Sequence, residues 1–277
     1  MMVCKKCGTE FMDGVNVCPA CGHDVENNIE PQDVESKKFP KKGKFIAIFV
    51  PIIAIVIGRL VGGFIGEFTA KNMMESGQKN DIEEFIEQME QYVPGHCDGN
   101  EYTSETFGFK FVIDENWGFY TDEDLTLASE SLDTTMTSTA LAELEKEDIS
   151  QKLKEKFEES LYAKAEMGAL YIADDIYVGE VIVSVMSGYG IEDVSVDEYV
   201  EGIKNNLSTT AQVTDEYIAG STYNVISANI TDVNGIDTMV KLYTKIENNM
   251  VCTITCRAVV GYEEQLFKAF EDGISAY

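Results

Sequence analysis

Four cysteines near the N-terminus have the spacing of a metal site. They form two Cys-x-x-Cys pairs, Cys4 with Cys7 and Cys18 with Cys21. Four thiolates suit zinc, because this ion prefers soft sulfur ligands in tetrahedral geometry. A redox dithiol or two disulfides are the alternatives, but two pairs in tandem are better explained by one shared ion. The sequence therefore predicts one structural Zn²⁺ per chain, with all four cysteines as ligands.

The residues between and after these pairs are suited to holding them in place. Gly8 and Gly22 each follow the second cysteine of a pair and free the backbone there. The intervening loop, Gly8–Val17, is long enough for a two-stranded ribbon that turns at Asp13-Gly14. So small a segment has no core of its own, so zinc would supply most of its folding free energy, on the order of 10 kcal/mol.

The run MMVCKKCGTEFMDGVNVCPACGHDV, residues 1–25, resembles the short zinc-ribbon domain at the N-terminus of many bacterial membrane proteins. This resemblance implies a structural zinc and a cytoplasmic interaction role. The local charge excludes the usual rival, nucleic-acid binding, because residues 1–35 hold two lysines against seven acids. We therefore expect a protein partner in the cytoplasm.

An apolar segment, Phe45–Gly66, follows a linker over residues 26–44 that ends in five lysines. As a helix its 22 residues would be about 33 Å long, enough to cross roughly 30 Å of hydrocarbon. Arg59 costs about 2.5–3.5 kcal/mol, and fourteen Phe, Ile, Leu and Val residues offset it at roughly 0.3–0.6 kcal/mol each. The lysines predict a cytoplasmic N-terminus. We expect a single-pass protein of the cell membrane that contacts lipid through residues 45–66, with its C-terminus extracellular.

Two further readings concern this span. A cleaved signal peptide fits poorly, because about forty residues with a metal site precede the apolar run. Gly58, Gly62 and Gly66 recur every four residues and form a face that permits close helix contact, so a homodimer through this face is possible.

Beyond the span the chain becomes strongly acidic, with 42 acids and 13 bases in residues 67–277. This excess argues against nucleic acid and anionic lipid as ligands. A juxtamembrane helix is expected to begin at Asn80, which has Glu83 at the capping-box position, and to end at Pro94-Gly95. Residues 67–99 are thus assigned to this helix and a linker.

Residues 100–277 have a mixed pattern that predicts an extracellular α+β domain, a sandwich on a largely antiparallel sheet. Alternating apolar residues and turn signals predict the strands: 107–111, 168–173, 178–187, 213–218, 223–230, 237–246 and 250–258. Helices are expected over 139–160, 195–207 and 262–275. Hairpin turns are expected at Asn234-Gly235 and Asn248-Asn249.

The order of these elements resembles the PsbP-like fold of bacterial envelope and lipoprotein domains. The likeness rests on Tyr102-Thr103-Ser104, the run 107–111, Trp117, the turn at Ile218-Ala219-Gly220 and the terminal strand and helix. Where members commonly carry a proline before the tryptophan, this chain has 114–116, Asp-Glu-Asn. The resemblance implies a mostly non-catalytic domain that binds partners or small ligands.

The residues themselves offer no catalytic or cofactor site. The sole histidine past the span, His96, lies in the predicted linker, a poor place for a general base. Cys252 and Cys256 would lie on one strand face roughly 13 Å apart, too far to bridge. We interpret both as small buried hydrophobic residues, with a disulfide from Cys97 to either as the alternative.

These patterns favour a membrane-anchored interaction protein that is not an enzyme. Its ribbon would dock a cytoplasmic protein, and its outer domain would bind an envelope component. The alternative is an envelope hydrolase of unknown type, which would require a convergent polar pocket in the outer domain.

Overall fold

The computed structural model describes residues 2–3, 10–11, 65–67, 69, 85, 87–89, 91–144, 162–174, 176–188, 196–207, 210–231 and 235–277. The chain forms two compact units, Met1–Gly43 and Lys44–Tyr277.

The first unit contains a short antiparallel ribbon. Strand β1, Met2–Val3, pairs with β2, Glu10–Phe11. The predicted ribbon turned at Asp13-Gly14, whereas this pairing joins segments that flank the first Cys-x-x-Cys pair in the sequence. The four cysteines lie outside the described residues, so the zinc site stays a prediction.

The second unit is built on a seven-stranded sheet in which every described pairing is antiparallel. Its strand order is β6-β7-β8-β12-β11-β10-β9. The bounds are β6 Trp117–Phe119, β7 Ala163–Ala173, β8 Ile176–Ser187, β9 Gln212–Ile218, β10 Ser221–Thr231, β11 Asp237–Glu247 and β12 Met250–Val259. Strands β8 and β12 lie at the centre and are almost wholly buried.

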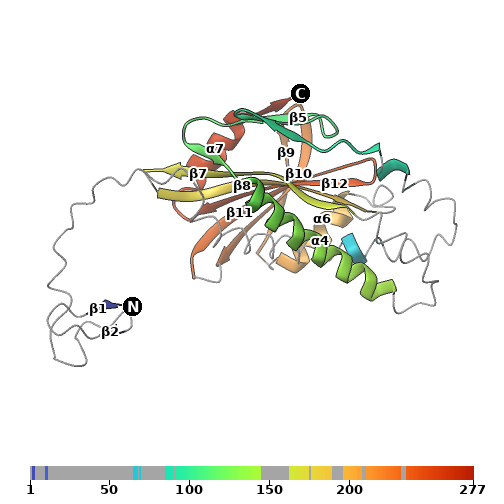
Figure 1. The fold of residues 1–277 in the computed structure, drawn as a ribbon, viewed down its shortest axis with the longest axis horizontal. Helices are drawn as coiled ribbons and strands as arrows, with labels where there is room; N and C mark the ends of the chain where they lie inside the picture. Colours follow the sequence, from blue (N-terminus) through green and yellow to red (C-terminus); the bar gives the residue numbers. More distant parts are fainter. Residues whose placement is uncertain are drawn as a thin grey trace. The chain divides into compact units, whose positions relative to one another are not determined.

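A smaller sheet and one helix cover one face of this sheet (Figure 1). The smaller sheet has the order β13-β5-β4-β3 and is also antiparallel. Its strands are β3 His96–Asp98, β4 Glu101–Ser104, β5 Phe109–Val112 and β13 Ile274–Ala276. Helix α7, Glu263–Gly273, packs beside it through Leu266, Phe267 and Phe270. Aromatic residues dominate the core between the layers.

Two other helices cover the opposite face (Figure 1). Helix α4, Asp122–Leu144, packs on β7 with a buried residue every four positions, at Ala128, Leu132, Met136 and Ala140. This spacing gives one apolar stripe along the helix. Helix α6, Val196–Leu207, lies over β9, β10 and β11 through Tyr199, Val200 and Ile203.

Tight two-residue turns set the register of the hairpins. Asn248 and Asn249 both have positive φ and join β11 to β12, as predicted for this pair. Ala219 and Gly220 do the same between β9 and β10. Two consecutive positive φ angles match the right-handed twist of the flanking strands.

A β-bulge at Glu166 changes which face the β7 side chains meet. Ala165 pairs with Ser184 and Met167 with Val183, so Glu166 is the extra residue on β7. Ala165 belongs to the helix-covered core, whereas Met167 belongs to the core under the smaller sheet. The bulge therefore exchanges the two faces of the strand and re-aims the side chain at its centre.

The predicted α+β class with a largely antiparallel sheet is confirmed. The start of the 139–160 helix was wrong, because α4 begins at Asp122 in a stretch of small polar residues with weak periodicity. Phe107 does not join the first strand but lies buried in the turn between β4 and β5. The last helix ends at Gly273, and the following residues pair with β5 as β13.

Of the predicted membrane span, only Ile65 and Gly66 fall among the described residues. Ile65 is buried in the core with α4, and a Cβ on Gly66 would lie 2.7 Å from the Met136 carbonyl oxygen. No helix in the described ranges combines the length and apolar character required to cross a bilayer. The span over 45–64 lies outside those ranges.

Candidate functional site

An open groove of about 760 Å³ lies between the end of the smaller sheet, the loop after it and helix α7. One wall comes from the segment that joins β5 to β6, and the other from a single stripe of α7. The described residues that line it are Asn100, Val112, Ile113, Asp114, Trp117, Tyr171, Gln265, Lys268, Ala269, Asp272 and Gly273.

The groove has an aromatic wall made by Trp117 and Tyr171. Their ring centroids are 4.7 Å apart, and Trp117 also meets Phe111 edge-on at 5.4 Å. Both wall residues are less than a tenth exposed, so the groove presents only part of each ring. The packing behind them fixes these rings in place.

Hydrogen bonds hold the loop that carries Asp114 and Trp117. The Asn116 amide donates to the Asp114 carboxylate at 2.8 Å, and the Trp117 amide donates to the Asp114 carbonyl at 3.2 Å. The Ile172 amide donates to the Asn116 carbonyl and joins the loop to β7. The loop is a turn built on the Asp114 side chain, a common role for this residue.

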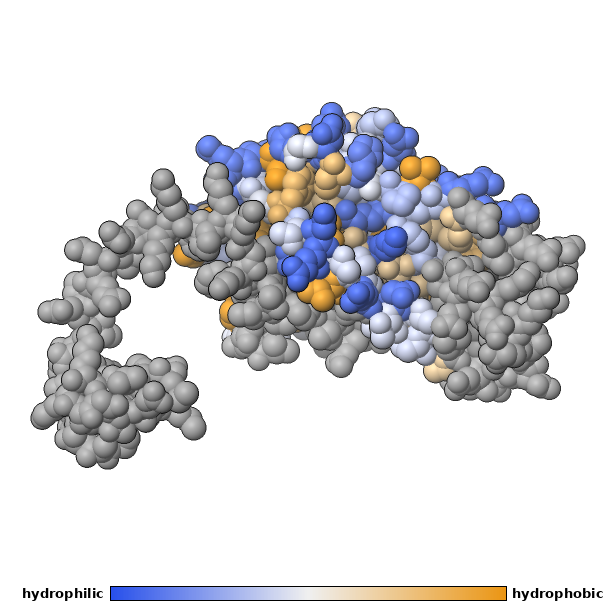
Figure 2. Space-filling model, in the orientation of Figure 1, coloured by the Kyte–Doolittle hydropathy of each residue, from blue (hydrophilic) through white to orange (hydrophobic). Residues whose placement is uncertain are grey.

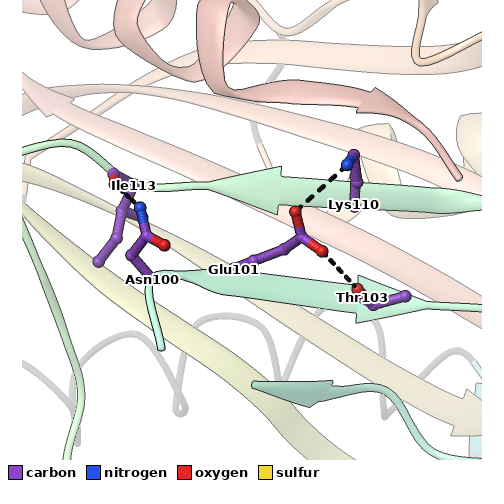
Figure 3. Close-up of polar contacts among 5 residues, drawn as sticks. All are labelled: Asn100, Glu101, Thr103, Lys110 and Ile113. Carbon is purple, nitrogen blue, oxygen red and sulfur yellow. Dashed lines mark hydrogen bonds and ion pairs between the residues drawn. The ribbon is translucent and has the colours of Figure 1, made fainter. Parts of the chain in front are cut away.

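The end of the β4–β5 pair closes the same wall. Figure 3 shows the Asn100 side-chain amide directed at the Ile113 carbonyl, to which it donates at 3.0 Å. Further along the pair, Glu101 accepts from Lys110 at 3.2 Å and from Thr103 at 3.5 Å. The groove therefore lies at the edge of the smaller sheet, whose outer surface is polar and whose side chains bond to one another.

On the α7 side the groove is lined by a lysine, an aspartate and a glycine. Lys268 and Asp272 form an ion pair at 2.7 Å one helical turn apart, and the hydrogen bond that Lys268 donates to the Asp272 carboxylate raises the pKa of Lys268. A Cβ on Gly273 would lie 2.7 Å from the Val112 carbonyl oxygen. Only glycine lets the helix end approach β5 this closely.

The surface around these elements is mixed in character. On the face displayed in Figure 2, hydrophilic residues lie between the hydrophobic ones. A concave site with partly exposed rings thus offers a more specific contact than the surrounding surface.

A second polar cluster surrounds Glu166 at the bulge. Its carboxylate accepts hydrogen bonds from the hydroxyls of Tyr92, Tyr102 and Tyr162 at 2.5 to 3.0 Å, and from the Gly95 amide at 2.9 Å. Burial raises the pKa of Tyr92, Tyr102 and Tyr162, and the Glu166 charge adds to it. These phenols therefore stay protonated and serve as donors.

A third cluster lies on the helix-covered face. Glu180 on β8 is fully buried and pairs with Arg257 of β12 at 2.6 Å, while the Tyr120 hydroxyl donates to its second oxygen. Burial raises the pKa of Glu180, although Arg257 and the neighbouring tyrosines oppose this shift. The Arg257 guanidinium also donates to the Tyr177 hydroxyl. The cluster is closed off from solvent and has a structural geometry.

The structure does not gather the remaining predicted residues into a site. His96 is exposed at the start of β3 rather than in a linker, and Cys97 beside it is exposed and free. Cys252 and Cys256 are free and buried on β12, which confirms their interpretation as hydrophobic residues. Among the described residues no group of three or more His, Cys, Asp or Glu side chains is placed to hold a metal ion.

Sequence reasoning missed the groove and the roles of Glu166 and Glu180. A signal did exist for one pair, since Glu180 and Arg257 are lone charges within long apolar strands. Trp117 entered only as a feature of the PsbP-like resemblance. Glu166 had no local signal, because two of its three phenol donors, Tyr92 and Tyr102, come from segments more than sixty residues away.

No protein-family model matches the sequence, and no curated protein matches it. Among solved structures, the chain is similar to LpqN, described as involved in cell envelope biogenesis of Mycobacterium tuberculosis, at 10% identity and a TM-score of 0.34. The match covers 60% of this chain and 82% of LpqN. A protein from Bacteroides thetaiotaomicron VPI-5482 matches at 11% identity and a TM-score of 0.34, over 65% of this chain and 49% of its own. These similarities are too low to assign the chain to a family.

Proposed function

We propose that this protein is a single-pass, membrane-anchored interaction protein whose extracellular domain binds an envelope component in the groove beside α7. The observation that carries the proposal is the groove itself, a concave site of about 760 Å³ whose lining includes the aromatic residues Trp117 and Tyr171. Ligand sites are typically concave, with apolar walls and a few polar groups. The cytoplasmic end of the proposal is the zinc ribbon held by Cys4, Cys7, Cys18 and Cys21, which would dock a protein partner.

The lining of the groove supports binding rather than chemistry. It includes carboxylates, amides and one lysine, but no histidine, cysteine or serine among the described residues. Its lysine is paired with Asp272, and Asp114 shapes a turn. A hydroxyl or thiol nucleophile of serine or cysteine with an adjacent histidine base is not among these groups.

The surroundings of Gly66 bear on the proposed homodimer. In the described structure this glycine lies against α4, so its close helix contact is made within the chain. A dimer through the predicted span would therefore depend on Gly58 and Gly62.

The groove can be tested by filling it. Ala269→Phe places a ring in the lining of the groove, and Ser138→Phe adds the same ring to an exposed position of α4. With purified full-length chain in detergent, we expect Ala269→Phe to lose retention on isolated cell-envelope material and Ser138→Phe to keep it. Equal retention of both variants would overturn the groove as the binding site.

Two other measurements address the remaining parts of the proposal. Metal analysis of the same chain should give near one zinc, lost in Cys18→Ser. Hydrolysis of an envelope substrate that disappears in Asp272→Asn, with an unchanged fold, would establish the alternative class, an envelope hydrolase.

A further inference from the structure

The groove contains one carboxylate without a counter-charge. Lys268 is neutralised by Asp272 at 2.7 Å, which leaves Asp114 as the remaining charge of the lining. Within the described part of the chain no ion pair joins Asp114, whose carboxylate accepts only the Asn116 amide at 2.8 Å. A carboxylate has about four lone-pair positions, so most of its acceptor capacity is open.

This carboxylate lies beside the aromatic wall. Asp114 and Tyr171 line the same groove, and burial together with the charge of Asp114 raises the pKa of Tyr171. Trp117, whose backbone amide donates to the Asp114 carbonyl, packs against the same tyrosine with the two rings tilted by 50°. An aromatic ring and a carboxylate that face one space both attract a cation, the ring through its negative face.

The charge of the whole protein acts in the same direction. The formal net charge is −28, and all of the excess acid lies beyond residue 66, where 42 acids face 13 bases. Such a field raises the local concentration of cations and repels anions, most strongly in a concave site. An anionic ligand is therefore disfavoured. A bare divalent metal ion would need several oxygen ligands, where the groove has one free carboxylate.

We propose that the groove recognises a positively charged amino group of its ligand, bound between the Asp114 carboxylate and the exposed part of the Trp117 ring. This inference rests on the proposed binding function and names the chemistry that the ligand must carry. Two sources of such a group are a lysine-type side chain and an amino sugar with a free amine. Both present an ammonium that donates to a carboxylate and lies against a ring.

The sequence supplies the reporter, because Trp117 is the single tryptophan of the chain. Its intrinsic fluorescence in the full-length protein therefore reports the groove alone. The probes are matched pairs that differ in one charge, N-acetyl-lysine amide with its ε-acetylated form and glucosamine with N-acetylglucosamine. We expect the two amines to shift the fluorescence to saturation, more weakly at higher ionic strength, and the acetylated forms to leave it unchanged.

Three variants test the role of Asp114. Asp114→Asn retains an acceptor for the Asn116 amide and should weaken amine binding about tenfold or more, since charge-assisted hydrogen bonds are the strong ones. Lys268→Met frees the Asp272 carboxylate and should tighten binding several-fold. Glu130→Gln removes one exposed acid from α4 and should bind as the unmodified protein does.

The outcomes separate this inference from the function on which it rests. Equal binding of an amine and its acetylated form, or wild-type affinity in Asp114→Asn, would overturn the cationic ligand class. A fluorescence response to N-acetylglucosamine alone would do so too, in favour of a neutral sugar, while the groove would stand as a binding site. If Ala269→Phe loses envelope retention but the unmodified protein shows no fluorescence response to either amine, the proposed function would likewise stand and the cationic ligand class would be rejected.

Discussion

Glu166 and Glu180 are carboxylates on neighbouring strands, β7 and β8, and the protein satisfies them in opposite ways. Glu166 lies on the side of the smaller sheet and accepts from three phenols and one amide, all of them neutral donors. Glu180 lies on the helix-covered side and is paired with a charged guanidinium. The first is partly exposed, and the second is fully buried.

The positions of the donors show what each carboxylate does. Those of Glu166 come from residues 92–95, from β4 and from Tyr162 just before β7, so this residue fastens the segment at 92–95 onto the domain. Gln88 reinforces the attachment by accepting from Asn249 in the β11–β12 turn. The partner of Glu180 lies directly across on the adjacent strand. Glu180 therefore stabilises the sheet, and Glu166 joins separate parts of the molecule.

Removal of the charged partner should have the largest effect. Arg257→Met leaves Glu180 buried without its counter-charge, and breaking a buried ion pair on one side costs about 3–5 kcal/mol. We expect a loss of this size in the free energy of unfolding, measured by denaturant titration of the purified chain. The double variant Arg257→Met with Glu180→Leu should recover most of the loss, because no buried charge remains. A double variant less stable than the single one would contradict this account.

Removal of Glu166, whose donors are all neutral, should cost less. Glu166→Leu leaves three hydroxyls and the Gly95 amide without an acceptor, but water reaches a partly exposed site. We expect a loss of about 2–3 kcal/mol in the free energy of unfolding, from the cost of unsatisfied polar groups. Glu166→Gln, which keeps one acceptor oxygen, should lose less.

The two carboxylates should also differ in their effect on proteolysis. In Glu166→Leu, limited proteolysis should cleave near Tyr92–Gly95 before the domain unfolds, because the attachment of this segment is lost. In Arg257→Met, cleavage should follow global unfolding. The same first cleavage site in both variants would remove the distinction between an attachment and a sheet contact.

The pH dependence of stability isolates Glu180. Burial raises its pKa above the ordinary 4.5, so the folded state keeps the proton at pH values where the unfolded state has released it. Its contribution to stability is present below the ordinary pKa and is lost as the pH rises through the folded value. Relative to Glu180→Gln, the protein should lose unfolding free energy as pH increases upward from 4.5, by at most about 1.4 kcal/mol per pH unit. Parallel curves for the two proteins would show that this carboxyl does not titrate in that range.

Local patterns were enough to predict the strands of the large sheet except β6 and the first part of β7. Alternation and turn residues predicted β9 to β12, and the asparagine pair at 248–249 predicted its hairpin, because these signals depend on nearest neighbours. Helix α4 was missed over Asp122–Ser138, where Ser and Thr are frequent and favour other conformations. The tertiary contact with β7 stabilises it instead.

The groove could not be predicted in the same way. Its walls come from residues near 100–117 and 265–273. These two segments come together only when β13, Ile274–Ala276, pairs with β5. Gly273 fell inside the predicted helix over 262–275, whereas it is the last residue of α7 and allows the close approach to β5. Long-range pairing of this kind has no signature in the local sequence.

The smallest effect is expected at the exposed ion pair of the smaller sheet, which can be compared with the buried pair of Arg257 and Glu180. Glu101 and Lys110 are 3.2 Å apart, but each side chain is 37% exposed, compared with 8% and 0% for Arg257 and Glu180 (Figure 3). Exposed pairs gain little, because water screens the attraction and ordering two long side chains costs entropy. A double-mutant cycle with Glu101→Gln and Lys110→Met should give a coupling energy of about 0–1 kcal/mol, reduced further at high salt. A coupling as large as that of Arg257 with Glu180 would mean that burial does not set the strength of ion pairs in this protein, and the contrast between the two faces would fail.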